Sequence, residues 1–516
     1  MIEENSYSSL PPRPREASRP NVRFIFIATL VLLFFRLLAI FILPPDGDEV
    51  VHLHIADDIG HFVRFPVYFY QQEMMGPLES YFLAPFIRFF GFSFWGGRLA
   101  YGLFFLSFLG MFCTVVRRLF DRELAVYLFL LLSFLPFPIL AFTTVVGYFE
   151  VLTLALLSLV LLLKMAGQIE GGWGSSLGLG VLSGLAFWCN PIFVVWLAAI
   201  GVGLIWLIPH SWPRKLPYGF LMGFLVGLFP LWIHGLQAGT LMTVKGHAGG
   251  DFARLQEVPE IFYLFFARLK YFLSTSSFGS VSPLIDELIR WLSLIPFVFF
   301  WFAFGTLIFS FVRSGKTATS QEKIFYSFVI LPSLMLILLY SSRHLVAEDE
   351  GARFFLPLLI PYAFVLAWWV RQFRSNFLKK AVLALLFSVL SLGYVFSGRE
   401  AFRKTSEFRE AARFLEKENL HFGMADIGIA YGLNVLSGHQ ILATPVPYRA
   451  PYEPILKKVQ QETPQFFILG RRDNRFRKKL EGDSNLTKMS LTDYDIFYGR
   501  SELLKHLVTL TDPSEE

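Results

Sequence analysis

Apolar segments long enough to cross a membrane recur from residue 22 to residue 397, with short charged stretches between them. About 20 consecutive apolar residues span a bilayer, and the backbone polar groups of a span must be satisfied within it, which favours helices. Only 17% of the residues are charged, whereas soluble domains carry about 25%. The sequence therefore predicts an all-α polytopic membrane protein.

The expected full spans are separated by short polar or basic stretches. They cover about 22–43, 97–117, 122–141, 146–165, 216–236, 289–312, 324–341, 353–371 and 378–397. Residues 176–208 are expected to form two short helices that meet at a turn around Asn190-Pro191. The segment 76–91 carries Glu79 and Arg88, is too short for a full span, and is expected only to dip into the outer leaflet. We therefore expect about 11 to 13 transmembrane helices.

The basic residues cluster on flanks that the positive-inside rule assigns to the cytoplasm. Arginines precede the first span and acidic residues follow it, which predicts a cytoplasmic tail at 1–21 and outer loops at 44–76 and 237–288. The chain is expected to be a multi-pass protein of the cell (inner or plasma) membrane. The net charge of +6 comes from these flanking clusters and does not indicate nucleic-acid binding.

The composition becomes polar after Gly398. FREAARFLEKE has a helical pattern, whereas FGMADIGI, HQILA and PQFFIL are typical of short strands. Residues 22–397 are therefore expected to form the membrane domain, and residues 398–516 a small soluble α/β domain on the extracytoplasmic side. Cys113 and Cys189 both lie in apolar segments, so a disulfide framework is not indicated.

The outer loop 44–76 carries a dense cluster of titratable residues. Asp48 and Glu49 follow the first span directly, where paired carboxylates can act as a general base or hold a cation. A solvated acidic loop accounts equally well for these residues taken alone.

Three further residues of this loop are spaced for one face of a helix. His54, Asp58 and His61 follow an i, i+4, i+7 pattern and could together bind a divalent metal. Two histidines and one carboxylate make a loose site, which favours the simpler interpretation of a wet amphipathic face.

Basic residues also gather on the expected outer side. Arg343 lies in a short outer loop, Arg353 begins the next apolar segment, and Lys245 lies in the long outer loop. An arginine at a helix mouth can clamp a phosphate, or it can extend its side chain to the membrane interface. Carboxylates and cations on one side of a membrane fit an enzyme that acts on a phosphorylated lipid.

Several segments, taken in order, resemble the GT-C superfamily of membrane glycosyltransferases. The branch of protein O-mannosyltransferases and aminoarabinose transferases keeps an Asp-Glu pair after its first span, where this chain has Asp48-Glu49. GPLESYFLAPFIRFFG followed by GGRLAYGLFFLSFLGMFCTVVRRLF is similar to a second stretch of that branch, and RFFLPLLIPYAFVLA to a third. Four further segments resemble, in order, stretches of a bacterial subgroup of this branch. They are GYFEVLTLALLSLVLLL, GLAFWCNPIFVV, GFLVGLFPLWIHGL and MADIGIAYGLNVLSGHQILATP.

The resemblance implies inverting transfer of a hexosyl or pentosyl unit from a polyprenyl-phosphate sugar to a lipid, glycan or protein acceptor on the outer face. Asp48 would be the general base, Glu49 would support it, and Arg353 would contact the lipid phosphate, with Arg343 or Lys245 as alternatives. No cofactor is required, and a divalent metal stays open as an option. The chain departs from the branch at Met75-Gly76, where the branch has Lys-Pro.

Two other classes of function stay open at the level of sequence. A transporter or flippase of a lipid-linked glycan would need charges along a path through the membrane, and most charges here stand at segment ends. A non-catalytic scaffold would use the C-terminal domain to bind a partner. Loss of activity with intact membrane integration on Asp48→Ala would separate the enzyme from the scaffold. Substrate movement that survives the substitution would indicate the flippase.

Overall fold

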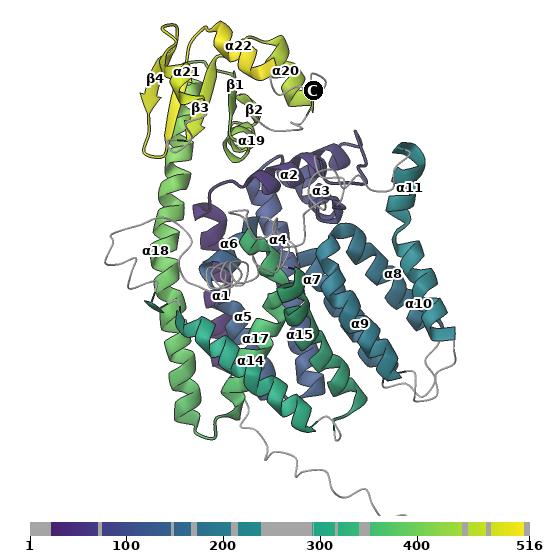
Figure 1. The fold of residues 1–516 in the computed structure, drawn as a ribbon. Coiled ribbons are helices and arrows are strands. Elements are labelled where there is room, and N and C mark those ends of the chain that lie inside the picture. The colour runs from purple at the N-terminus through teal and green to yellow at the C-terminus, as the bar shows by residue number, and fades with distance from the viewer. Residues whose placement is uncertain are drawn as a thin grey trace, which may run out of the picture.

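The computed structural model describes residues 22–70, 75–145, 149–166, 173–207, 215–238, 291–292, 294–314, 318–339, 351–445, 453–470 and 476–509. Figure 1 shows a helical bundle with a small sheet domain beyond one end of it. A single long helix, α18 (Asn376–Lys417), runs along the bundle and enters the sheet domain. Two helices, α2 (Gly47–Gly60) and α3 (Leu78–Phe90), lie across the end of the bundle that faces this domain.

The remaining elements of the bundle follow the apolar segments of the sequence. The first group is α1 (Val22–Ile42), α4 (Phe94–Leu119), α5 (Arg122–Ser133), α6 (Phe137–Val145) and α7 (Phe149–Ala166). The second group is α8 (Trp173–Cys189), η1 (Pro191–Phe193), α9 (Val194–Leu207), α10 (Lys215–Gly227) and α11 (Phe229–Ala238). The third group is α14 (Leu294–Ser314), α15 (Ser320–Leu339), η4 (Gly351–Leu358) and α17 (Leu359–Gln372).

The prediction of a helical multi-pass membrane protein is confirmed. Among the described residues, five helices are long and apolar enough to cross a membrane, and up to eight spans result if each bent helix pair is one span. The shorter apolar helices α8 and α9 meet at Asn190, whose side chain accepts a hydrogen bond from the backbone N–H of Ile192. The turn expected at Asn190-Pro191 is therefore present.

Two of the expected spans, 122–141 and 216–236, are bent. The chain turns by 78° between α5 and α6, and by 49° between α10 and α11. Pro136 and Pro138 flank the first bend, and Pro230 follows the second. Proline lacks a backbone N–H and disfavours helical geometry in the residue before it, so each bend falls where the sequence removes helical hydrogen bonds.

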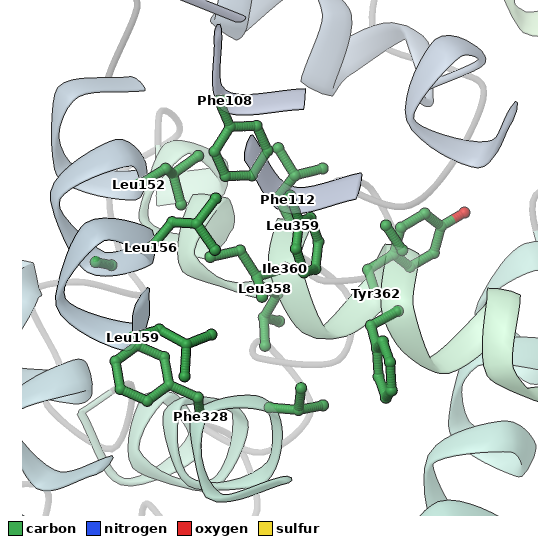
Figure 2. Packing of buried hydrophobic residues seen from close by; sticks show 14 of the residues in the cluster. Phe108, Phe112, Leu152, Leu156, Leu159, Phe328, Leu358, Leu359, Ile360 and Tyr362 are labelled. Carbon is green, nitrogen blue, oxygen red and sulfur yellow. The ribbon is translucent and has the colours of Figure 1, made fainter. Parts of the chain in front are cut away.

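The helices of the bundle pack through close-fitting apolar side chains. Figure 2 shows buried side chains from α4, α7, α15 and α17 converging on one another, among them Phe108, Leu156, Phe328 and Leu359. Within a bilayer, such van der Waals packing replaces the hydrophobic effect as the force that holds helices together. This core fixes the bundle end on which α2 and α3 rest.

The C-terminal domain contains a five-stranded sheet with the strand order β2-β1-β3-β5-β4. Its strands are β1 (Phe422–Ala425), β2 (Leu442–Pro445), β3 (Phe466–Gly470), β4 (Thr487–Ser490) and β5 (Tyr494–Tyr498). Its helices are α19 (Ile427–Leu436), α20 (Glu453–Gln461), α21 (Arg477–Glu481) and α22 (Glu502–Thr509). Both neighbours of β1 run parallel to it, whereas β5 pairs antiparallel with β3 and β4. The expected small α/β domain is confirmed.

The boundary expected at residue 398 lies inside α18, which continues without a break into the sheet domain. The Thr405 hydroxyl of α18 donates to the carbonyl of Ile42 at the end of α1, at 2.8 Å. Two residues before Thr405, Arg403 forms ion pairs with Glu407 of the same helix and with Asp493, which precedes β5. One helix therefore binds the membrane part and the sheet domain to each other.

Candidate active site

Residues 47–60 of the stretch expected to be an outer loop form the helix α2, and most of its residues are buried. Asp46 caps the N-terminus of α2, because its side chain accepts the backbone N–H of Asp48 at 2.9 Å. Apolar residues of α2, including Val50, Leu53 and Ile55, pack against α3, α4 and α19. The solvated-loop and wet-face interpretations are therefore wrong for most of α2, since helices cover it on several sides.

Glu49 is fully buried and forms a bidentate ion pair with Arg98 of α4. The Arg98 guanidinium donates to both carboxylate oxygens of Glu49, at 2.5 and 2.8 Å. The same guanidinium donates to the backbone carbonyls of Ile40, Leu43 and Pro44. These carbonyls stand at the end of α1, where no following helical turn supplies backbone N–H donors for them. Glu49 thus joins α1, α2 and α4, and we assign it a positioning role in place of direct contact with a substrate.

Asp48 stands beside this ion pair in the first turn of α2 and is half-buried. A carboxylate in the first turn of a helix interacts favourably with the positive end of the helix dipole. The neighbouring Glu49–Arg98 pair fixes the backbone that carries Asp48. Asp48 therefore has the rigid support and the partial exposure that a general base needs.

A chain of buried polar groups extends from α2 toward α3 and α7. His52 lies one turn after Asp48, and its Nδ1 is 2.9 Å from the Ser80 hydroxyl, while its Nε2 is 3.7 Å from Glu79. Glu79 accepts the backbone N–H of Phe149 at 3.1 Å and lies close to the Glu150 side chain. Burial, and next the charge of Glu150, raise the pKa of Glu79 well above its usual range.

The predicted metal ligands His54, Asp58 and His61 are not brought together. The phenolic hydroxyl of Tyr70 donates to Asp58 at 2.5 Å, and Nδ1 of His61 lies 3.1 Å from the Asp57 carboxylate. His54 is buried and packs against aromatic rings. Within the described ranges, no group of three His, Cys, Asp or Glu side chains could hold a metal ion.

None of the three predicted phosphate ligands has a described side chain. Lys245 and Arg343 are outside the described residues. The backbone of Arg353 lies in η4, but its side chain is outside the described part. Their role therefore stays a prediction.

The departure at Met75-Gly76 has a structural reason. The backbone N–H of Gly76 donates to the carbonyl of Trp188 at 2.8 Å, which a proline could not do. A Cβ at Gly76 would lie 2.4 Å from the Trp188 ring, so a larger residue does not fit either. The Trp188 indole in turn donates to the carbonyl of Val67 at 3.0 Å. This region is packed around Trp188 in a way that excludes the proline of the branch.

The C-terminal domain rests directly on α2. The His54 ring lies 5.7 Å from the ring of Tyr431 in α19 and 5.9 Å from the ring of His439, which follows α19. His439 stacks on Phe92 at 4.6 Å. His54, which the sequence associates with a metal, thus contacts the sheet domain.

Sequence reasoning missed Arg98, and it placed Glu79 and Glu150 only in segments without assigning them roles. Each of the three is a charged residue within or beside an apolar segment, which in a membrane protein marks a buried partner or a functional site. A charge in an apolar segment identifies such a residue from the sequence. It does not reveal the hydrogen-bond partner, which lies 49 positions away for Arg98 and 70 positions away for Glu79.

The chain combines a helical membrane bundle, an acidic helix directly after the first span and a C-terminal α/β domain. The comparison with solved structures agrees. ArnT from Cupriavidus metallidurans bound to undecaprenyl phosphate matches with a TM-score of 0.55 and 12% identity, over 93% of this chain and 99% of that chain.

The apo structure of the same ArnT matches with a TM-score of 0.53 and 12% identity, over 95% of this chain and 99% of that chain. No family model matches the sequence, and no curated protein matches it. The predicted resemblance to the GT-C superfamily is confirmed at the level of the fold.

Proposed function

We propose that this chain is an integral membrane glycosyltransferase that moves a sugar from a polyprenyl-phosphate donor to an acceptor on the outer face of the membrane. The observation that carries the proposal is the half-buried Asp48, placed at a helix N-terminus and held there by the Glu49–Arg98 ion pair. The fold shared with ArnT, whose structure holds undecaprenyl phosphate, supports the donor class.

The reaction needs a base and a cation, and little else. Asp48 accepts the proton of the acceptor hydroxyl or amine while that atom forms a bond to the anomeric carbon of the sugar. The bond between the anomeric carbon and the phosphate oxygen breaks, with inversion, and polyprenyl phosphate leaves as an anion. Arg353, with Arg343 and Lys245 as alternatives, is proposed to bind that phosphate. No cofactor is required for these steps.

The proposed orientation follows the charge distribution of the chain. The protein lies in the cell membrane (inner or plasma membrane), with its N-terminus in the cytoplasm. The C-terminal domain lies on the extracytoplasmic side, together with α2. The donor reaches Asp48 from the lipid phase, and the acceptor is a lipid, a glycan or a protein. A hexosyl and a pentosyl donor are both compatible with these residues.

The test is Asp48→Asn, compared with Asp57→Asn as a matched control further along the same helix. We expect Asp48→Asn to lower sugar transfer in membrane vesicles by about 10²- to 10⁴-fold without loss of protein from the membrane. Asp57 pairs with His61 at the surface, so its substitution leaves transfer close to the wild-type rate. Mass spectrometry of envelope lipids and glycans from a deletion strain identifies the missing product.

Two results would count against the proposal. An unchanged envelope in the deletion strain contradicts a transferase. Movement of a lipid-linked glycan across the membrane that survives Asp48→Asn, with no glycosylated product, indicates the flippase.

A further inference from the structure

The sheet of the C-terminal domain has a topological switch point next to the candidate active site. From β1 the chain passes through α19 to β2 on one side of β1, and then through α20 to β3 on the other side. In α/β sheets, ligands bind outside the carboxyl ends of the two strands where the order reverses. In this sheet the two strands are β1 and β3. The last residue of β3 that pairs with β1 is Ile468, and β3 continues beyond it as far as Gly470.

A pocket of about 340 Å³ lies at this switch point. Its volume falls within the range of small-molecule sites, about 300 to 1,000 Å³. Its lining includes Lys404 and Phe408 of α18, Asp426 at the end of β1, Gly470 of β3 and Tyr494 of β5. Four elements therefore contribute side chains or backbone to one concave site.

The charges of the pocket disfavour a phosphate. Asp426 caps α19 by accepting the backbone N–H of Gly428, so a carboxylate already occupies the place where a phosphate would sit. Lys404 balances this one negative charge, which leaves no excess of positive charge among the lining residues.

The polar groups of the pocket suit sugar hydroxyls. Asp426 can accept and Lys404 can donate charge-assisted hydrogen bonds. Burial, followed by the charges of Asp493, Glu407 and Asp426, raises the pKa of Tyr494 to about 12, so its hydroxyl stays a donor. The rings of Tyr494 and Phe408 provide an apolar surface for the C–H face of a sugar ring.

The pocket opens beside the N-terminus of α2. Pro44 and Pro45, which lead into α2, form part of its lining. A Cβ on Gly428 would lie 3.8 Å from the backbone nitrogen of Gly47. A molecule held in the pocket is therefore within a few residues of Asp48.

We propose that this pocket binds a saccharide unit of the acceptor, as a neutral polyhydroxyl ligand held between the C-terminal domain and the first turn of α2. The role as acceptor subsite rests on the proposed transferase function, whereas binding of a saccharide does not. Gly470 offers a direct way to block the pocket, because a Cβ there meets no atom within 4 Å. In β3 it shares a face with Phe466 and Ile468, which pack in the same cluster as Phe408.

The test uses the full chain in nanodiscs, which avoids sugar-based detergents. Saturation-transfer NMR measures binding of chitotriose and maltotriose, with uridine diphosphate and inorganic phosphate as anionic probes. We expect an oligosaccharide signal that Gly470→Leu abolishes, and that Tyr494→Phe weakens about fivefold through loss of one hydrogen bond. Thr487→Leu, on the exposed edge strand β4, is the matched control and keeps the signal.

The variants separate this proposal from the transferase proposal. Asp48→Asn is expected to keep oligosaccharide binding while it loses transfer. If the wild-type protein transfers no sugar and Gly470→Leu still abolishes binding, the saccharide pocket stands and its acceptor role falls.

Other outcomes overturn the pocket itself. These are no oligosaccharide signal above empty nanodiscs, a signal that persists in a folded Gly470→Leu protein, or binding of the anionic probes alone. If Gly470→Leu fails to fold, Tyr494→Phe and Lys404→Gln decide the question in the same assay.

Discussion

The ion pair of Glu49 and Arg98 shows how single residues position this site. Both side chains are buried, and Arg98 satisfies the Glu49 carboxylate together with three backbone carbonyls near the end of α1. Removal of one partner of a buried pair leaves an uncompensated charge, which costs about 3 to 5 kcal/mol. The two partners are not equivalent, because Arg98 also holds the carbonyls.

Arg98→Met is therefore expected to destabilise the protein more than Glu49→Gln does. The arginine variant leaves a buried carboxylate and three carbonyls without their donor, with a loss of about 3 to 5 kcal/mol. Thermal unfolding of the purified proteins measures the order. Arg88→Met on the exposed face of α3 serves as the control and is expected to change little. Equal losses for the Glu49 and Arg98 variants would contradict the carbonyl contribution.

Asp495 is the residue through which acid is expected to weaken the C-terminal domain. Burial alone would raise its pKa, but hydrogen bonds from Ser490 and Arg477 and the charge of Lys488 outweigh burial and hold the pKa below its usual value. A depressed pKa stabilises the fold above the unfolded-state pKa of about 3.9. That stabilisation is lost as the pH falls through the folded-state value.

Asp495→Asn is accordingly expected to cost about 1 to 3 kcal/mol at neutral pH, through loss of charged hydrogen bonds. Its difference from the wild type should shrink below about pH 4, where this carboxyl becomes protonated in the unfolded chain before it does in the folded protein. Melting temperatures recorded across pH values test both statements. Glu410→Gln, at an exposed site on α18, should show no such dependence. A pH-independent gap between Asp495→Asn and the wild type would argue against the linkage.

At the scale of elements, α8 and α10 are joined through glycines. A Cβ at Gly184 would lie 2.3 Å from the carbonyl oxygen of Phe224, and one at Gly223 would lie 2.1 Å from that of Leu177. The two backbones are thus in direct contact, as small residues allow in membrane helices. No side chain at these positions could shift to make room, because the obstacle is backbone.

Gly184→Ala is therefore expected to separate α8 from α10 and to cost about 1 to 3 kcal/mol. Gly178→Ala is a matched control in the same helix, since its Cβ would meet only an ordinary contact with Leu161 at 3.9 Å. Expression level and thermal stability in membranes measure the effect. If both variants behave alike, the close approach of the two helices is not what stabilises this pair.

At the scale of the whole molecule, the C-terminal domain is held against the site by two elements. α18 carries it from the bundle, and α19 packs on α2 and the linker before it (Figure 1). A Cβ at Gly432 of α19 would lie 2.9 Å from Cβ of Pro45 and 2.7 Å from the ring of Phe408. Glycine at this position lets the domain approach the turn that precedes Asp48.

Gly432→Leu is expected to push the C-terminal domain away from α2 and to lower transfer about tenfold or more, because a displacement near 1 Å can cost 100-fold in rate. Both parts should stay folded, since each has its own core. Limited proteolysis and the transfer assay together measure this effect. Thr487→Leu, remote from α2 on β4, should leave both readouts unchanged. Full activity with an altered proteolysis pattern would show that domain contact is not needed.

Much of the element order follows from the sequence alone. Runs of apolar residues dictate membrane helices because a backbone in hydrocarbon must satisfy its own hydrogen bonds. The change of composition after Gly398 indicates the α/β domain, and the Asp48-Glu49 pair after the first span indicates the candidate site. These are local properties, set by burial and hydrogen bonding within short windows of the chain.

The tertiary structure alone decided the partners. It paired Glu49 with Arg98, directed His54 toward the C-terminal domain, and placed a pocket of the sheet beside α2. Such contacts join residues tens to hundreds of positions apart, and the same carboxylate is a base, a salt-bridge partner or a solvated group according to what folds against it. The sequence by itself determined that charged groups stand after the first span, and only the packing of α4 and α19 on α2 decided which of them stays accessible for chemistry.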